Sequence, residues 1–245
     1  MKKSVFLMAL IVPAFIGCRQ SEAGANASDN AQASERKPVE TVAETHNKPE
    51  DFVPKGYVVF EKNSGDLNKD GLDDCILIIK GTDKKKFVQH EYRGELDRNR
   101  RGIIVLFNKN KQYELAVKNY DCFSSENEEG GVYFPPELDI YAEKGNLYVH
   151  YAHGRYGYWT YTFRYKYPDF DLIGYDSSDN MGPMTLSETS INFLTKKKLE
   201  RVNVNRDGEE DGDEIFKDTW SKIKNTESYK LSKIKDFDEF DLSEL

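Results

Sequence analysis

The sequence contains few cysteines, 3 in 245 residues. Disulfide frameworks belong to small, cysteine-dense secreted domains, so Cys75 and Cys122 cannot be the framework of a domain this large. These two residues could form a single bridge in an oxidising compartment, or they could remain free as buried apolar thiols. Both alternatives stay open at the level of sequence.

Motifs that carry catalysis are also missing. The sequence has no Gly-x-Ser-x-Gly nucleophile elbow, no Walker phosphate loop and no dinucleotide-binding glycine motif. His150 and His153 are three residues apart on a predicted strand, so their imidazoles point to opposite faces and cannot easily share a zinc ion. We therefore predict no catalytic residues and expect a protein that is not an enzyme.

The net charge is -8 and the isoelectric point is near 5.2, which argues against binding nucleic acid or an anionic membrane through net charge. One local stretch is the exception. It contains Lys84, Lys85, Lys86, Arg93, Arg98, Arg100 and Arg101. Acidic residues are interleaved with these cations, so we expect a solvated loop and strand edge there.

Residues 1–17 have the organisation of a signal peptide. A charged start at Lys2 and Lys3 is followed by an apolar stretch that reaches Val12. The residues Phe15-Ile16-Gly17-Cys18 resemble the lipobox of bacterial lipoproteins, in which the cysteine is diacylated and the chain is cleaved before it. The resemblance implies a covalent lipid on Cys18 that attaches the chain to a membrane. The alternative is an ordinary secretory signal with an incidental cysteine.

The residues after the cysteine indicate a location and a tether. Arg19, in place of Asp, is what the resemblance associates with transport to the outer membrane. Residues 19–51 contain no aromatic side chain and too little apolar surface to offset the entropy of ordering. We expect residues 18–51 to be the lipidated cysteine and a disordered tether, and residues 52–245 to be a single β-rich globular domain.

Short runs rich in Val, Ile, Tyr and Phe, separated by Gly, Asn, Asp and Pro, dominate the sequence from Gly56 onward. The predicted strands are residues 57–61, 75–80, 103–107, 113–117, 138–142, 147–153, 158–167, 170–175, 191–194 and 199–204. Because no regular alternation of strands and helices is present, the fold class is mainly β, with an antiparallel meander or sandwich-like sheets.

The clearest strand surrounds Trp159, where aromatic residues at odd positions alternate with more polar residues at even positions. Residues 213–224 instead predict one short C-terminal helix, because Phe216, Trp220 and Ile223 fall at i, i+4 and i+7. The acidic segment that follows has apolar residues at a three-residue spacing and should pack back on the domain. These residues are Leu231, Ile234, Phe237, Phe240 and Leu242.

A nine-residue stretch ending at Asp74 has the pattern of a calcium loop. Such a loop needs oxygen ligands at alternate positions, a glycine for the sharp turn and a further acid. The expected ligands are the side-chain oxygens of Asp66, Asn68, Asp70 and Asp74 and the carbonyl oxygen of Leu72. The stretch resembles the DxNxDGxxD loop of FG-GAP or VCBS-type repeats, which implies a structural Ca²⁺ between two strands. The alternative is an Asx-rich turn without an ion.

Two further segments are candidate sites. Residues 203–211 repeat the spacing of the calcium loop, but Arg206 adds a cation, so we favour a hairpin or loop without metal. Residues 153–159 form a glycine-rich segment with aromatic side chains that could stack on sugars or hold a protein partner. Its binding candidates are Arg155, Tyr156 and Tyr158, and the alternative is a turn beside a core strand.

Three stretches resemble an uncharacterised family of bacterial lipoproteins. They are Cys122-Phe123-Ser124-Ser125-Glu126-Asn127, Gly154-Arg155-Tyr156-Gly157-Tyr158-Trp159 and Ile191-Asn192-Phe193-Leu194-Thr195. The resemblance implies an envelope location and a β-rich fold, without an activity. We expect a lipid-anchored binding or scaffold module with a calcium-stabilised loop, an unidentified protein or glycan partner and no nucleic acid. The alternatives are an immunity or inhibitor protein against a toxin, and a glycan hydrolase.

Overall fold

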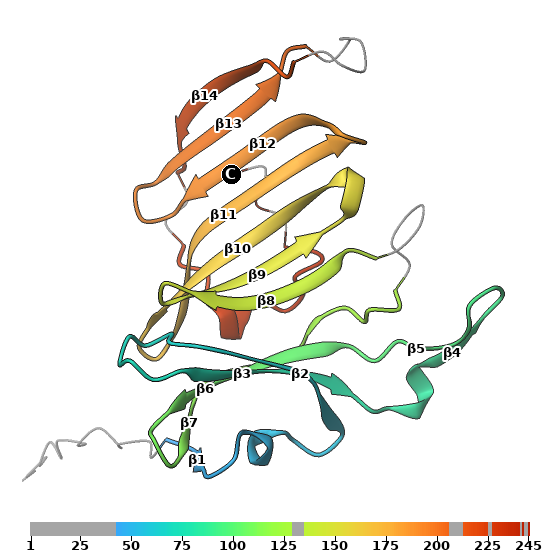
Figure 1. The fold of residues 1–245 in the computed structure, drawn as a ribbon, viewed down its shortest axis with the longest axis vertical. Helices are drawn as coiled ribbons and strands as arrows, with labels where there is room; N and C mark the ends of the chain where they lie inside the picture. The colour runs from blue at the N-terminus through green and yellow to red at the C-terminus, as the bar shows by residue number, and fades with distance from the viewer. Residues whose placement is uncertain (1–42, 129–134, 206–212, 225–226, 241, 243–244) are drawn as a thin grey trace, which may run out of the picture. The chain divides into compact units, whose positions relative to one another are not determined.

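The computed structural model describes residues 43–128, 135–205, 213–224, 227–240, 242 and 245. The predicted signal peptide, Cys18 and residues 19–42 of the expected tether lie outside these residues. The described residues form fourteen strands and four short 3-10 helices, and the paired strands of every sheet are antiparallel (Figure 1). The prediction of a mainly β, antiparallel fold is confirmed.

A five-stranded sheet has the order β1-β7-β6-β3-β2. Its strands are β1 (Thr45–His46), β2 (Tyr57–Gly65), β3 (Asp74–Gly81), β6 (Arg101–Asn108) and β7 (Tyr113–Phe123). β3 and β6 are interior strands whose residues are buried on both faces, which explains their nearly continuous apolar sequences.

A seven-stranded sheet is a simple meander, because each strand pairs with its neighbours in sequence (Figure 1). Its strands are β8 (Glu137–Glu143), β9 (Asn146–Ala152), β10 (Gly157–Lys166), β11 (Asp169–Met181), β12 (Met184–Asn192), β13 (Lys197–Asn203) and β14 (Phe216–Lys222). The remaining elements are β4 (Phe87–His90), β5 (Gly94–Asp97), η1 (Pro49–Phe52), η2 (Lys84–Lys86), η3 (Gly154–Tyr156) and η4 (Leu231–Lys233).

The predicted C-terminal helix at residues 213–224 is wrong, because this segment forms β14. Phe216 and Trp220 are four residues apart, a spacing that places two side chains on one face of a helix and also on one face of a strand. Ile223 was the residue that favoured the helix. It lies beyond the end of β14, where it is buried and its N–H donates to the carbonyl of Lys196 (3.1 Å). Pairing with β13 therefore decides the structure of the segment.

The main core lies between the two sheets, and strand alternation selects its residues. The five-stranded sheet contributes Ile76, Ile78, Ile103, Val105, Phe107 and Val117. The seven-stranded sheet contributes Ile140, Leu147, Val149, Tyr151, Tyr161, Phe163, Phe170, Leu172, Tyr175 and Ile191. The odd-numbered aromatic residues of β10 point into this core as predicted, up to Tyr165. Tyr167 lies beyond the end of the strand and is 84% exposed.

The opposite face of the five-stranded sheet has a smaller core. Cys75, Leu77 and Ile79 of β3 lie on this face, with Phe52 packed over them. The ring of His46 contacts Phe52 edge to face, at 4.6 Å between centroids. Within residues 43–51, expected to belong to the tether, the structure describes β1 as an edge strand of this sheet and the first three residues of η1.

The acidic C-terminal segment packs into the main core, as its apolar spacing predicted. Leu231, Ile234, Phe237 and Leu242 are buried there. The side-chain amide of Asn119 on β7 donates to the carbonyl oxygens of Leu231 and Ile234, both at 2.7 Å. The segment also reaches the other sheet, where the carbonyl of Tyr229 accepts from the N–H of Leu172. It therefore joins the two sheets.

The two sheets also meet at an edge, where β2 lies beside β8. The Asn63 side-chain amide donates to the carbonyl of Ile140 at 2.7 Å. Gly65 follows on the same strand, so close to β8 that a side chain there would overlap Ala142. This contact places the loop after β2, which contains the predicted metal ligands, beside the β8–β9 turn.

Candidate functional site

The loop between β2 and β3 folds around the carboxylate of Asp66. Its Oδ1 accepts from the N–H of Asp70 (3.2 Å) and its Oδ2 accepts from the N–H of Gly71 (3.0 Å). Lys69 has φ of 64° and Gly71 has φ of 86°, so the chain reverses through left-handed conformations, which glycine adopts without strain. The predicted turn at Gly71 is confirmed.

Two more of the predicted ligands meet at the same turn. Asn68 Oδ1 accepts from the N–H of Asp70 (2.9 Å), and its Nδ2 donates to Asp70 Oδ2 (3.0 Å). Asp70 Oδ1 in turn accepts from the N–H of Leu72 (3.0 Å). The structure thus brings the side chains of Asp66, Asn68 and Asp70 together. The ammonium of Lys109, 3.9 Å from Asp70 Oδ2, is a nearby cation.

Asp74, the fifth predicted ligand, has a different environment. It is fully buried, and its Oδ2 accepts from the N–H groups of Leu67 (2.9 Å) and Asn68 (3.3 Å). Its Oδ1 accepts from the N–H of Asn108 on β6 (3.0 Å). Burial raises the pKa of Asp74, while these hydrogen bonds oppose the shift. Asp74 therefore fastens both ends of the loop to the five-stranded sheet.

The loop packs against the turn between β8 and β9. A hollow of about 300 Å³ lies between them, lined by Asp66, Lys69, Glu143 and Gly145 among others. Gly145 has φ of 75° and lies directly against the side chain of Lys69. In the described part of the chain, no group of three or more His, Cys, Asp or Glu side chains is arranged to hold a metal ion.

The predicted binding segment forms the corner between β9 and β10. Arg155 and Tyr156 lie in η3 and line a cavity of about 400 Å³ with Glu137 and His153. The rings of Tyr156 and His153 are 5.2 Å apart. Tyr156 is 39% exposed, so its ring is accessible to a ligand although it also contacts the ring of His153.

Tyr158, the third binding candidate, lines a second, smaller cavity of about 220 Å³ on the open face of the seven-stranded sheet. Asp176, Glu188 and Arg201 line it as well. Arg201 forms ion pairs with Glu188 (2.6 Å) and Asp218 (3.1 Å). Burial raises the pKa of Tyr158, and the carboxylates of Glu188 and Asp176 raise it further.

The residues of this second cavity were not predicted from sequence. They come from β11, β12 and β13, and strand pairing brings them into one row, since Ser178 faces Glu188 and Glu188 faces Arg201. Predicting this cavity would have required the pairing register of the strands. Each residue alone is an ordinary polar position on an exposed strand face.

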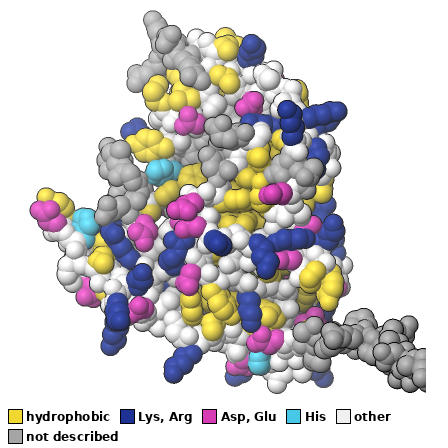
Figure 2. Space-filling model, turned by 180° about the vertical axis from the view of Figure 1, so that it is seen from behind, with side chains coloured by type: hydrophobic (Ala, Val, Ile, Leu, Met, Phe, Trp, Pro, Cys, Tyr) yellow, Lys and Arg dark blue, Asp and Glu magenta, His cyan; other side chains and the backbone are white. Residues whose placement is uncertain are grey.

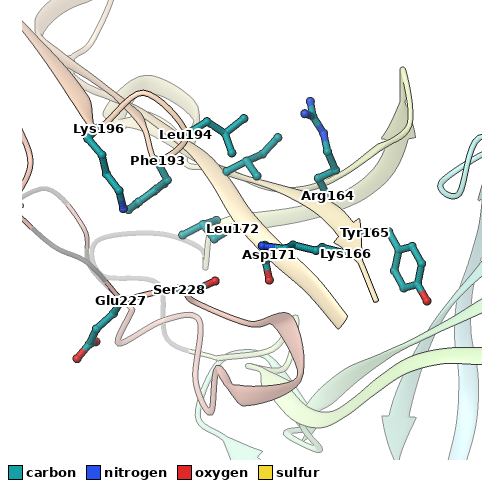
Figure 3. Close-up of a pocket in the computed structure, with 11 residues that line it drawn as sticks. Arg164, Tyr165, Lys166, Asp171, Leu172, Phe193, Leu194, Lys196, Glu227 and Ser228 are labelled. Atoms are coloured by element: carbon teal, nitrogen blue, oxygen red, sulfur yellow. Dashed lines mark ion pairs between the residues drawn. The ribbon is translucent and has the colours of Figure 1, made fainter. Parts of the chain in front are cut away.

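A third cavity, of about 360 Å³, lies where β10 and β11 approach the β12–β13 turn and the C-terminal segment (Figure 3). Leu172 and Phe193 are its buried apolar residues. Asp171 lines it, but this carboxylate is paired with Lys230 and with Lys166 (3.7 Å). The charge of Asp171 is thus neutralised within the fold.

Other predicted features have clear positions in the structure. Cys75 and Cys122 are both free and buried, on opposite faces of the five-stranded sheet. β13 and β14 pair with each other, and residues 206–211 of the second calcium-like stretch lie outside the described residues. His150 Nδ1 is 2.7 Å from Thr160 Oγ1, a cross-strand pair in the seven-stranded sheet.

Comparison with known proteins gives no match to a family model, to a curated protein or to a solved structure. Among the described residues, none of the helices has the length and apolar composition needed to cross a membrane.

Proposed function

We propose that this protein is a lipid-anchored binding module of the bacterial cell envelope. Cys18 would carry the lipid, and Arg19 after it favours the outer membrane. One observation supports a binding role above all. Exposed Tyr156 and Tyr158, two residues apart at this corner, each line a cavity.

The corner is closely packed against β11. Gly157 has φ of 113°, and a Cβ there would lie 1.9 Å from the carbonyl oxygen of Ser178 on β11. Only glycine allows the chain to enter β10 this close to β11. Binding surfaces gain affinity when aromatic and arginine side chains are presented in advance, because less ordering is needed on binding. Arg155, Tyr156 and Tyr158 fit this role for a protein or glycan partner.

We further propose that the loop at Asp66 binds a structural Ca²⁺. The donor set consists of oxygens only, which is the preference of calcium. Asp66, Asn68 and Asp70 surround one turn, and an ion there would neutralise carboxylates that repel each other. The Leu72 carbonyl and Asp74 would complete the set, with Asp74 reached by reorganising its present hydrogen bonds. An ion would stiffen the loop against the β8–β9 turn.

A calcium titration tests this site. Millimolar Ca²⁺ should raise the melting temperature of the wild-type chain, and Asp70→Ala should abolish the rise. Asp73→Ala is the matched control, because Asp73 is exposed and lies outside the alternating positions. An equal rise in the Asp70→Ala chain would contradict the assignment.

A photo-crosslinking residue at position 156 tests the binding corner in intact cells. Tyr167, 84% exposed at the opposite end of β10, is the matched control position. We expect discrete adducts from position 156, lost when Arg155→Glu is added, and none from position 167. The same adducts from both positions would argue against a specific surface. For the anchor, labelled palmitate should enter the wild-type chain but not Cys18→Ala.

A second candidate function is inhibition of a basic protein. The open sheet face around Tyr158 carries Asp139, Asp176, Glu188 and Asp218, and the last two share one cation, Arg201. Such a surface would attract a basic partner and give binding that weakens with salt. Salt-insensitive crosslinking from position 156 would favour the first function over this one.

A further inference from the structure

Residues 84–97, here named the arm, leave the five-stranded sheet between β3 and β6. The arm contains η2 and the hairpin of β4 and β5, which pair only with each other in the described structure. β3 and β6 are direct neighbours, so the arm is an insertion that the sheet itself does not need. Figure 1 shows it extending away from both sheets.

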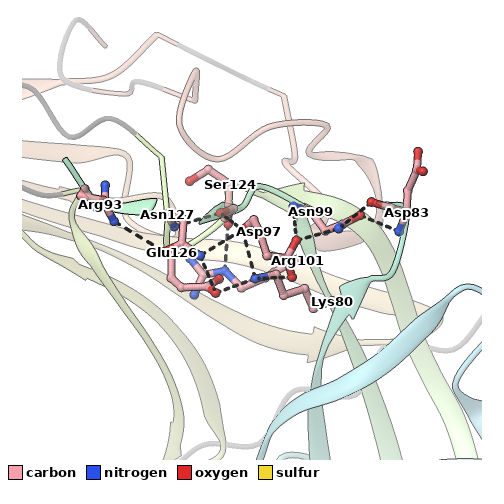
Figure 4. Close-up of polar contacts among 10 residues, drawn as sticks. Lys80, Asp83, Arg93, Asp97, Asn99, Arg101, Ser124, Glu126 and Asn127 are labelled. Atoms are coloured by element: carbon pink, nitrogen blue, oxygen red, sulfur yellow. Dashed lines mark hydrogen bonds and ion pairs between the residues drawn. The ribbon is translucent and has the colours of Figure 1, made fainter. Parts of the chain in front are cut away.

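The base of the arm is held by a ring of hydrogen bonds around Asn99. This residue is 3% exposed, and its side chain both accepts from the N–H of Asp83 (2.9 Å) and donates to the Asp83 carbonyl (3.0 Å). Its Nδ2 and its N–H also donate to Asp97 Oδ1, at 2.6 and 2.9 Å. The two chain segments entering and leaving the arm are thereby tied together (Figure 4).

A buried cation completes this base. Lys80 is 5% exposed and forms ion pairs with Asp97 (3.0 Å) and Glu126 (2.5 Å). The carbonyl of Asp97 accepts from Ser125 Oγ and Asn127 Nδ2, each at 3.0 Å. Buried charges are tolerated only when such partners satisfy them. These hydrogen bonds and ion pairs therefore hold the base of the arm against the five-stranded sheet.

The arm has exposed aromatic rings in its hairpin and a cluster of lysines at its root. Tyr92 at its tip is 83% exposed and Phe87 is 42% exposed. Within the described residues, Lys84, Lys85, Lys86 and Arg93 form no ion pair. The acidic residues of the arm are Glu91, Glu95 and Asp97, and Asp97 is paired with Lys80. The positive charge of the arm is therefore concentrated at its root, in Lys84, Lys85 and Lys86, on a protein of net charge -8. Figure 2 shows lysine and arginine side chains interspersed with acidic ones over the lower half of the molecule.

We propose that the arm binds the anionic surface of a lipid bilayer. Lysines attract anionic headgroups, by about fivefold in partitioning for each lysine near the surface. Tyrosine rings favour the boundary between headgroups and acyl chains, where the ring is apolar and the hydroxyl stays hydrated. A hairpin fixed at its base, with Tyr92 at its tip and three lysines at its root, fits shallow contact of this kind. The proposal does not depend on the binding corner, nor on a lipid at Cys18.

An environment-sensitive fluorophore at the tip tests the proposal. The full chain carries Cys18→Ser and Tyr92→Cys, so that the label enters only position 92, because Cys75 and Cys122 are buried. We expect a blue shift with vesicles of phosphatidylcholine and phosphatidylglycerol, and none with phosphatidylcholine alone. A label at Tyr167→Cys is the control, since Tyr167 is 84% exposed. It should not respond to either vesicle.

Charge reversal then tests whether the lysines of the arm, rather than the net charge of the protein, cause binding to anionic vesicles. Lys84→Glu, Lys85→Glu and Lys86→Glu together should lower partitioning onto anionic vesicles at least tenfold. Lys217→Glu, Lys222→Glu and Lys224→Glu, exposed at the far strand β14 and just after it, make the same charge change and should leave it nearly unaltered. Melting temperatures of both triple variants check that the fold is intact.

Three outcomes would overturn the proposal. One is an equal shift with uncharged vesicles, and another is an equal shift at position 167. The third is a response to a soluble polyanion such as polyglutamate without any response to vesicles, which would assign the arm to an acidic protein partner instead.

Discussion

Gly65 on β2 lies directly against Ala142 on β8, so that a Cβ on Gly65 would be 2.6 Å from the Cβ of Ala142. Gly65→Ala should therefore destabilise the domain by about 1–3 kcal/mol, because the two sheets must separate locally to admit a methyl group. Urea unfolding measures this loss. Adding Ala142→Gly removes the opposing methyl, so the double variant should lose less stability than the sum of the single variants. Simple additivity would mean that the two strands are not in contact.

The carboxylate of Asp97 should make the domain sensitive to acid. Burial alone would raise its pKa, but hydrogen bonds from Asn99 and the ion pair with Lys80 outweigh burial and lower it. A lowered folded-state pKa gives stability that is present above the ordinary aspartate value of 3.8 and is lost as the pH falls below it. Asp97→Asn should cost about 1–3 kcal/mol at neutral pH.

The measurement for Asp97 is a pair of urea curves, at neutral pH and at about pH 3. The stability difference between wild type and Asp97→Asn should shrink at the acid pH, because the Asp97 carboxylate of the unfolded chain binds a proton more readily than that of the folded protein. Asp51→Asn, at an exposed position, should show no such change. A difference that stays constant with pH would contradict the ion pair at the base of the arm.

Neither Cys75 nor Cys122 should react with thiol reagents in the folded protein. Burial raises the pKa of Cys75 to about 11 and raises that of Cys122 further, so both remain protonated thiols at about pH 8. In a Cys18→Ala chain, mass spectrometry after alkylation should detect no adduct under native conditions and two adducts in denaturant. Finding no adduct in denaturant without reductant would reveal a disulfide.

Phe237 anchors the C-terminal segment. Its ring stacks on Phe123 at 4.9 Å between centroids and meets Tyr161 edge to face at 5.2 Å. Phe237→Ala should cost about 3–5 kcal/mol, since it removes a fully buried aromatic side chain between the sheets. Phe87→Ala, at a position 42% exposed, is the matched control and should cost far less. Equal effects would mean that the segment is not part of the core.

Local patterns predicted the parts of the fold that depend on alternation. The strand around Trp159 could be recognised because its odd positions face one core, and the apolar run after Asp74 because β3 is buried on both faces. The turn at Gly71 followed from side chains that bond to their own backbone. These features require no knowledge of distant residues.

What failed depended on contacts between distant residues. Phe216 and Trp220 fit a helix and a strand equally, and only pairing with β13 decides between them. The sequence of the arm did not predict a hairpin held at its base, because the ion pair between Lys80 and Glu126 joins residues 46 positions apart. The cavity beside Tyr158 could not be predicted from sequence either, because its residues come together only through the pairing of β11, β12 and β13.

The C-terminal segment also bears on how the protein can be made. Leu231, Phe237 and Leu242 form part of the core between sheets whose strands were synthesised much earlier. A ribosome or an export channel delivers a chain from its N-terminus, so the apolar faces of both sheets stay open to other molecules until this segment emerges. The core between the sheets can therefore be completed only once residues 231–242 have emerged, so the order of synthesis sets the order in which the two sheets become covered.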